Sequence, residues 1–132
     1  MKNLKKLMLV ISACLLITAC GPKSPKEVAK TVIMATKKLD FETLKKCVSS
    51  ERLPGIAKEE KNFKENPEEA ADFMLMVKDA EIEIISETIS EDGNSATVIV
   101  KISKVRGEDR ALEKDIYLVK ENGEWKFDAN PF

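Results

Sequence analysis

The sequence predicts an α+β fold in which N-terminal helices pack on one face of a four-stranded antiparallel meander sheet. Two observations indicate this order. Apolar residues recur at helical spacing as far as Val77, and from Ala80 onward they alternate with polar residues at the period of a strand. Turn-forming residues such as Asn122-Gly123 separate the alternating segments, which favours antiparallel pairing of consecutive strands. The length of 132 residues suits a single domain.

The first predicted helix begins at Ser24-Pro25. Ser24 is a good N-cap, Pro25 suits the first helical position, and Glu27 completes a capping box. We expect this helix to continue to about Leu39. One stripe of small and aliphatic side chains should face the core, with a second row beside it: Val28, Val32, Ala35 and Leu39, then Ala29, Ile33 and Thr36.

A second, shorter helix should follow, with Asp40 as its cap. Its apolar face should carry Phe41, Leu44, Cys47 and Val48. We interpret Cys47 as a small buried hydrophobic residue, and the alternative is a reactive or partner-linking thiol.

The middle of the chain has weaker signals. We expect a break at Pro54-Gly55, a frayed helix that contains Ile56 and Phe63, and a last helix over about Pro67 to Val77. The apolar run of residues 73–77, FMLMV, is interpreted as core packing. The alternative is a pliable partner-binding surface, because methionine adapts to irregular partners.

Four strands are predicted from the alternating segments. The first lies in "EIEIISETIS", the second in "ATVIVKISKV", the third in "ALEKDIYLVKE" and the last in "EWKFD". On the second and third strands Val98, Val100, Ile116 and Leu118 share one face, and Ile99, Tyr117 and Val119 lie on the other. One of these two faces should meet the helices, and the other should form a small pocket, a dimer contact or ordinary surface.

Candidate catalytic groups are few. Asp115 and Tyr117 are two residues apart on one strand face, with Glu113 in line, and such a pair arises often by chance. The interpretation we favour is a surface carboxylate beside a packed tyrosine. The chain has no histidine, no paired metal-ligand spacing and no phosphate-binding glycine loop, so neither a metal nor a cofactor is predicted.

The N-terminus is typical of a signal peptide. Lys2, Lys5 and Lys6 come without an acidic residue, and an apolar stretch follows from Leu7 to Ile17, too short for a membrane-spanning helix of about 20 residues. The chain should therefore be targeted out of the cytoplasm and the segment removed.

The segment ends in a pattern that resembles the lipobox of bacterial lipoproteins, and the pattern occurs twice. Ile11-Ser12-Ala13-Cys14 would leave too short an apolar stretch before it and an apolar string after it, whereas Ile17-Thr18-Ala19-Cys20 leaves a polar tether. We therefore assign Cys20. The resemblance implies cleavage before Cys20, a thioether-linked diacylglycerol and an amide-linked acyl chain such as palmitate. The alternative is an ordinary secretory signal cleaved after Ala19.

These assignments divide the chain into a removed signal peptide, residues 1–19, a lipidated cysteine and short tether, residues 20–23, and one α+β domain, residues 24–132. Removal of Cys14 and acylation of Cys20 leave Cys47 alone, so no internal disulfide is expected.

Charge is distributed unevenly. The processed chain has a net charge of −4, because 19 basic and 23 acidic residues remain, and this argues against a nucleic-acid partner. Lys23 to Lys46 has a net charge of +4, and Glu51 to Asp92 has a net charge of −8. Lys23, Lys26 and Lys30 are interpreted as a solvated helix face, and the alternative is contact with anionic lipid head groups.

Three segments carry a family resemblance: the opening "SPKEVAKTVIMATKKLDFETLKKCVSS", the strand "NSATVIVKI" and the ending "LVKENGEWKFD". In this order they resemble small bacterial lipoproteins with a domain of unknown function, similar to the lumazine-binding-like branch of the nuclear-transport-factor-two-like, or cystatin-like, superfamily. The resemblance implies a cone-shaped sheet. Enzymes in that superfamily typically use a carboxylate base and a Tyr or acid donor in the cone's cavity, so the alternative function is a small enzyme that uses Asp115 and Tyr117.

The function that we expect is a membrane-tethered, noncatalytic binding or interaction module. It should be anchored through lipid on Cys20 on the extracytoplasmic side of the bacterial envelope. This would be the outer membrane of a Gram-negative cell, or otherwise the outer face of the cytoplasmic membrane. Its partner could be a protein or a small ligand, and the oligomeric state stays open.

Overall fold

Helices occupy the first half of the chain and strands the second half in the computed structural model, which describes residues 23–128. The predicted signal peptide with Cys14, and the predicted lipidation site Cys20, lie outside the described residues. The elements are α2 (Pro25–Lys37), α3 (Phe41–Cys47), η1 (Ser50–Arg52), α4 (Leu53–Glu65), α5 (Pro67–Val77), β1 (Glu81–Ile89), β2 (Ser95–Ser103), η2 (Val105–Gly107), β3 (Ala111–Glu121) and β4 (Glu124–Phe127).

The predicted α+β fold is confirmed. The sheet has the order β1-β2-β3-β4 with every neighbouring pair antiparallel, which is the expected meander. The turn between β3 and β4 has positive φ at both central residues, 52° at Asn122 and 78° at Gly123, as a tight hairpin turn requires.

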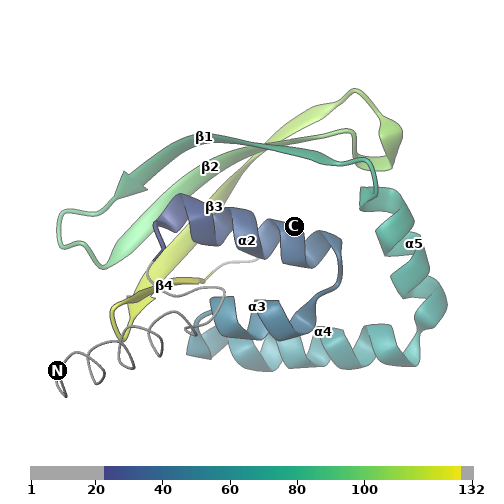
Figure 1. The fold of residues 1–132 in the computed structure, drawn as a ribbon, viewed down its shortest axis with the longest axis horizontal. Helices are drawn as coiled ribbons and strands as arrows, with labels where there is room; N and C mark the ends of the chain where they lie inside the picture. The colour runs from purple at the N-terminus through teal and green to yellow at the C-terminus, as the bar shows by residue number, and fades with distance from the viewer. Residues whose placement is uncertain (1–22, 129–132) are drawn as a thin grey trace, which may run out of the picture.

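Helix α2 lies against one face of the sheet and forms the core with it (Figure 1). The predicted stripe is buried at Val28, Val32 and Ala35, and the second row is buried as far as Ile33. The helix ends at Lys37, two residues earlier than expected, so Leu39 lies beyond it and is only half-buried. On the sheet side, the side chains that meet α2 and its neighbours are Val98, Val100, Ile102, Ile116 and Leu118. Among the described residues the core cluster runs from Val28 to Phe127.

Both ends of α2 are specified locally. The Ser24 hydroxyl accepts a hydrogen bond from the Glu27 amide at 3.4 Å, as a cap should. At the other end the Asp40 amide donates to the Ala35 carbonyl at 2.8 Å and the Leu39 amide donates to the Thr36 carbonyl at 3.0 Å. These bonds form a Schellman motif, with Leu39 at φ 53° in the position that usually holds glycine.

Strand β1 departs from simple alternation. The pairing shifts between Ile84 and Ser86, so one extra residue is inserted as a β-bulge. After the bulge Glu87 pairs with the buried Val98 and therefore faces the helices. Its carboxylate accepts a hydrogen bond from the Lys26 amide at 2.9 Å, which places a negative charge at the N-terminus of α2.

The C-terminal strand is fastened to the segment between α3 and α4. The Ser49 amide donates to the Phe127 carbonyl, and the Ser49 hydroxyl donates to an Asp128 carboxylate oxygen, each at 2.8 Å. Ser49 is only 2% exposed. The Ser50 amide donates to the Glu121 carboxylate at 2.7 Å, and Arg52 Nε donates to the Asp128 carbonyl. These hydrogen bonds, which we call the Ser49–Asp128 joint, connect the segment between α3 and α4 to β3 and β4.

Two expectations for the middle of the chain are wrong. Pro54-Gly55 does not break the chain but lies in the first turn of α4, where the missing proline amide hydrogen costs nothing because first-turn amides have no helical partner. The run 73–77 is not core: α5 buries only Val77, and Leu75 is 68% exposed. The physical reason is that α5 packs against α4 and η2 at the edge of the molecule, away from the sheet face that α2 covers (Figure 1).

Cys47 is fully buried, as predicted, and it is disulfide-bonded in the structure. The prediction of no internal disulfide concerns the chain after removal of Cys14 and acylation of Cys20, and for that processed chain it stays a prediction.

No helix within residues 23–128 combines the length and the apolar character needed to cross a bilayer.

Candidate functional site

Asp115 and Tyr117, the pair singled out in the sequence, lie on the outer face of β3. Both side chains are exposed, whereas the intervening Ile116 points to the core. The Tyr117 hydroxyl lies 3.4 Å from an Asp115 carboxylate oxygen, at the long limit of a hydrogen bond. Glu113 is exposed on the same face. The pair thus faces away from the helices, and it lines neither of the two cavities described next.

The first cavity lies within the helical layer, and we call it the helical cavity. It has a volume of about 350 Å³ and is lined by α2, α3, η1, α4, α5 and β4. Its walls are mainly aliphatic and aromatic, and Arg52 and Glu59 are the charged residues among them. The apolar wall includes Val32, Leu39, Phe41, Leu44, Ile56 and Phe127. A mostly apolar pocket with a few polar groups is the usual form of a small-molecule site.

Three aromatic rings organise this region. Phe41 of α3 and Phe63 of α4 have ring centroids 6.1 Å apart, and Phe63 and Phe73 of α5 have centroids 5.7 Å apart. Such tilted pairs are favourable arrangements of aromatic side chains. The three rings connect α3 to α4 and α4 to α5, and Phe63 and Phe73 also line the second cavity. Phe63 and Phe73 therefore form a wall that the two cavities share.

A charged contact also positions α4. Lys45 of α3 and Glu60 of α4 form an ion pair of 2.6 Å. The hydrogen bond from Lys45 holds the pKa of Glu60 below its usual value. Both groups are at the surface, so the pair fixes orientation more than it contributes stability.

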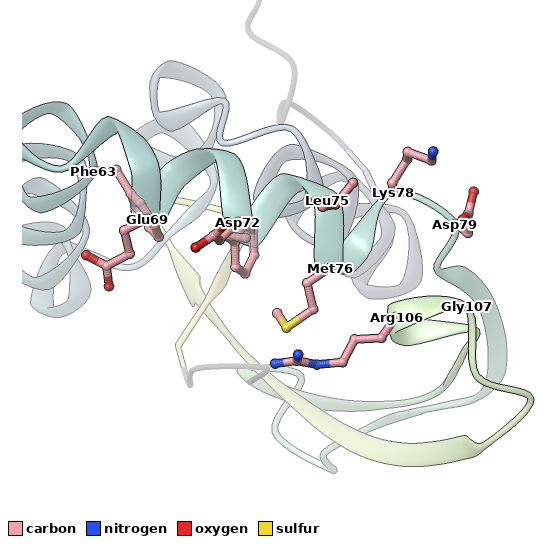
Figure 2. A pocket seen from close by; sticks show the side chains of 10 residues that line it. Phe63, Glu69, Asp72, Leu75, Met76, Lys78, Asp79, Arg106 and Gly107 are labelled. Atoms are coloured by element: carbon pink, nitrogen blue, oxygen red, sulfur yellow. The ribbon is translucent and has the colours of Figure 1, made fainter.

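The second cavity is an open groove between α5 and η2, which we call the α5 groove (Figure 2). Its volume is about 810 Å³. Apolar atoms come from Phe63, Phe73, Leu75 and Met76. In Figure 2 Met76 extends from α5 toward the side chain of Arg106, which runs alongside the helix. Charged groups surround this apolar surface: Glu69, Asp72, Lys78, Asp79 and Arg106.

The opposite wall of the groove has an unusual backbone. Lys104 and Arg106 adopt positive φ, 59° and 57°, a conformation that is costly for residues other than glycine. Lys104 Nζ donates to a Glu81 carboxylate oxygen at 2.7 Å, which ties this connection to the start of β1. That hydrogen bond raises the pKa of Lys104. The connection is therefore held in place while Arg106 is presented to the groove.

Sequence reasoning missed both cavities. Residues 106–109, RGED, read as a connecting turn, and nothing in their pattern indicated that Arg106 faces α5. The charged Arg52 and Glu59 fell in the segment with weak helical signals. Within the described part of the chain, no group of three or more Cys, Asp or Glu side chains is arranged to hold a metal ion.

Comparisons with known proteins agree with the fold. Residues 18–128 match the family described as domain of unknown function (DUF4878). A crystal structure of a Campylobacter jejuni protein, provisionally described as an NTF2-like transpeptidase, superposes with a TM-score of 0.55 at 18% identity. The match covers 82% of this chain and 100% of that one. No curated protein matches the chain. The match shows a shared NTF2-like fold, and the family match spans most of the sequence, so the chain belongs to the DUF4878 family.

Proposed function

We propose that this protein is a lipid-anchored, noncatalytic binding module of the bacterial cell envelope, with the lipid on Cys20. The N-terminal sequence supports the anchor, because a short basic start, an apolar stretch and an aliphatic-small-small-cysteine box coincide there. Two or more acyl chains anchor a protein stably, whereas one chain does so only marginally. The resemblance to lipoproteins noted in the sequence is consistent with this anchor.

The start of the domain supports a short tether. Ser24 already caps α2, so only residues 21–23 separate the proposed lipidated cysteine from the first helix. A segment of this length spans about 10 to 15 Å at most. Lys26 and Lys30 are exposed on this first helix, where they would contribute attraction to anionic head groups of about 1 kcal/mol each.

The observation that carries the binding role is the helical cavity. It is of a size for a small molecule, mainly apolar, and lined by residues of six elements, α2, α3, η1, α4, α5 and β4. The lining therefore favours a ligand with an apolar body, for which Arg52 and Glu59 provide polar contacts at the edge.

Several observations favour binding over catalysis. The chain has no histidine, the Cys47 side chain is fully buried, and Asp115 and Tyr117 point away from both cavities. A transpeptidase such as the one named for the Campylobacter protein needs an activated nucleophile with a neighbouring base. At 18% identity the likeness concerns the fold, and the described residues offer no such pair in either cavity.

The anchor is tested by metabolic labelling with an alkynyl fatty acid. Wild type and Cys14→Ala should incorporate the label and sediment with membranes, whereas Cys20→Ala should do neither. The two cysteines follow the same local pattern, so each controls for the other. Label that persists in Cys20→Ala would refute the assignment.

The binding site is tested with variants at Gly55. Binding is followed with 1-anilinonaphthalene-8-sulfonate, a fluorescent probe that has an aromatic apolar body and one sulfonate group. A Cβ built at Gly55 meets nothing within 4 Å, so Gly55→Leu can extend a side chain at the cavity wall, and Gly55→Ala is the matched control. We expect Gly55→Leu to weaken probe binding about tenfold and Gly55→Ala to leave it within about twofold. If Leu75→Ser removes binding and Gly55→Leu does not, the probe occupies the α5 groove and the cavity assignment is wrong.

A further inference from the structure

We propose that the α5 groove docks a cationic amphipathic helix of a protein partner. The inference does not depend on the lipid anchor or on the helical cavity, because it concerns a different surface. It begins with a helix whose apolar residues have no cover. Leu75, which lines the groove, is 68% exposed, and α5 buries only Val77. Met74 is 46% exposed on the same helix but does not line the groove. Exposed side chains of this size, grouped on one short helix, indicate an interaction surface.

The apolar part of the groove suits a helix with aliphatic anchors. Leu75, Met76 and the two rings of Phe63 and Phe73 are the apolar residues of the lining. Methionine side chains adapt to differently shaped partners, because they are unbranched and flexible. Helix α5 has 11 residues and is about 16 Å long, which matches about three turns of a partner with anchors at i, i+4 and i+7.

The charged residues around the groove determine whether a positively or a negatively charged partner is favoured. From Glu65 to Asp79 the chain carries five carboxylates and one lysine, a net charge of −4. Glu69, Asp72 and Asp79 line the groove, against Lys78 and Arg106. Among residues 23–128 the side chains of Asp72 and Arg106 make no hydrogen bond or ion pair, so both are available to a partner.

An anionic membrane or a nucleic acid is therefore disfavoured on this face, because it would meet like charge. A helix with lysine or arginine beside its apolar stripe would bury Leu75 and also complement the carboxylates. In Figure 1 α5 and the N-terminal end of α2 lie toward opposite ends of the molecule. The groove therefore lies away from the residues where the domain begins.

The experiment uses the full-length protein and a labelled Leu/Lys model peptide of about four helical turns. We expect binding measured by fluorescence anisotropy, and no binding of the Leu/Glu counterpart of the same length. Leu75→Ser should weaken binding about tenfold. Leu112→Ser is the matched control: Leu112 is 47% exposed on β3, does not line the groove, and should have an effect within about twofold.

The charge requirement is tested separately. Asp72→Asn should weaken binding about three- to fivefold and reduce its salt dependence. Glu91→Gln removes the same charge from an exposed residue between β1 and β2, and should leave binding unchanged. Arg106→Gln, which removes a cation from the groove, should tighten binding a few-fold. Circular dichroism and thermal melts confirm that each variant is folded.

Three results would overturn the proposal. The first is equal binding of the Leu/Lys and Leu/Glu peptides. The second is that Leu75→Ser weakens peptide binding no more than Leu112→Ser does, and Asp72→Asn no more than Glu91→Gln does. The third is concentration-dependent dimerisation that Leu75→Ser abolishes in sedimentation velocity, because a second copy of the chain would then cover the groove.

Discussion

Helices α2 and α5 begin in the same way but end up in different environments. Each has proline in its first turn and acidic residues nearby, and α5 has the more apolar sequence. Yet α2 buries a full stripe against the sheet, whereas α5 buries one residue and leaves Leu75 largely exposed. The comparison teaches that apolar content alone does not decide burial. What decides it is whether a sheet face lies opposite the helix.

The two regions should also differ in how much they contribute to stability. The sheet, α2 and α3 form one cluster of fully buried side chains, which we call the core layer. Helices α4 and α5 attach to it through the aromatic contacts, the Lys45–Glu60 ion pair and the η2 connection, and we call them the helical arm. We therefore expect mutations to be costly in the core layer and mild in the arm.

The largest effect should come from Trp125 on β4. Its side chain is 7% exposed, and it packs beneath the ammonium of Lys120, which lies 5.1 Å from the ring centroid. Trp125→Ala removes this burial and leaves a cavity, so we expect the free energy of unfolding to fall by about 3 to 5 kcal/mol in urea denaturation. Leu75→Ala on the arm should change it by less than about 0.5 kcal/mol. Near-wild-type stability of Trp125→Ala would contradict the assignment of β4 to the core layer.

A smaller effect is expected at the joint between the two regions. Ser49→Ala removes the hydroxyl that donates to Asp128 in a site that is 2% exposed, and should cost about 1 kcal/mol of unfolding free energy. Ser50→Ala is the exposed counterpart: it removes a hydroxyl that donates to a Glu121 carboxylate oxygen at 2.9 Å, while the Ser50 amide keeps its own bond to Glu121. The two variants are compared by urea denaturation. Equal costs would show that the buried hydroxyl has no special role.

Replacing a residue in the helical arm by a better helix former should stabilise the protein. Gly55 lies inside α4 with a negative φ and room for a methyl group. Gly55→Ala should therefore raise the free energy of unfolding by about 0.5 to 1 kcal/mol, because alanine loses less backbone entropy. Gly123→Ala is the contrasting variant: Gly123 has φ 78°, so the same change should destabilise. Thermal unfolding of both variants gives the comparison, and a loss of stability in Gly55→Ala would indicate strain in the first turn of α4.

The smallest effect concerns pH at the start of α3. The Thr43 hydroxyl donates to Asp40 at 2.6 Å and, with the Thr43 amide, lowers the pKa of Asp40 below its ordinary 3.8. Because the folded value is the lower one, the stabilisation is present above the unfolded value and is lost as pH falls through the folded pKa. Thr43→Val should raise the pKa of Asp40, and Thr43→Ser should preserve it. NMR titration of the carboxyl carbon measures both, and an unchanged pKa in Thr43→Val would show that the Thr43 hydroxyl does not cause the shift.

Local signals in the sequence were sufficient to predict most of the helices and strands. Ser24 and Asp40 cap their helices, Asn122-Gly123 forms its turn, and the alternation of Val98, Val100 and Ile102 marks one face of β2. These predictions were correct because capping, turn geometry and strand alternation depend on residues within a few positions of one another. The candidate site was less accessible, because each cavity wall combines segments that are far apart in the chain.

By itself, the sequence determined the order of elements, the meander and which residues share a face. Only the tertiary structure decided which way each face points. Asp115 and Tyr117 do share a face, and it is the outer one. The bulge in β1 turns Glu87 toward α2, and the position of α5 leaves Leu75 uncovered. The physical reason is that alternation and helical periodicity are local properties, whereas the partner of a face is set by long-range packing.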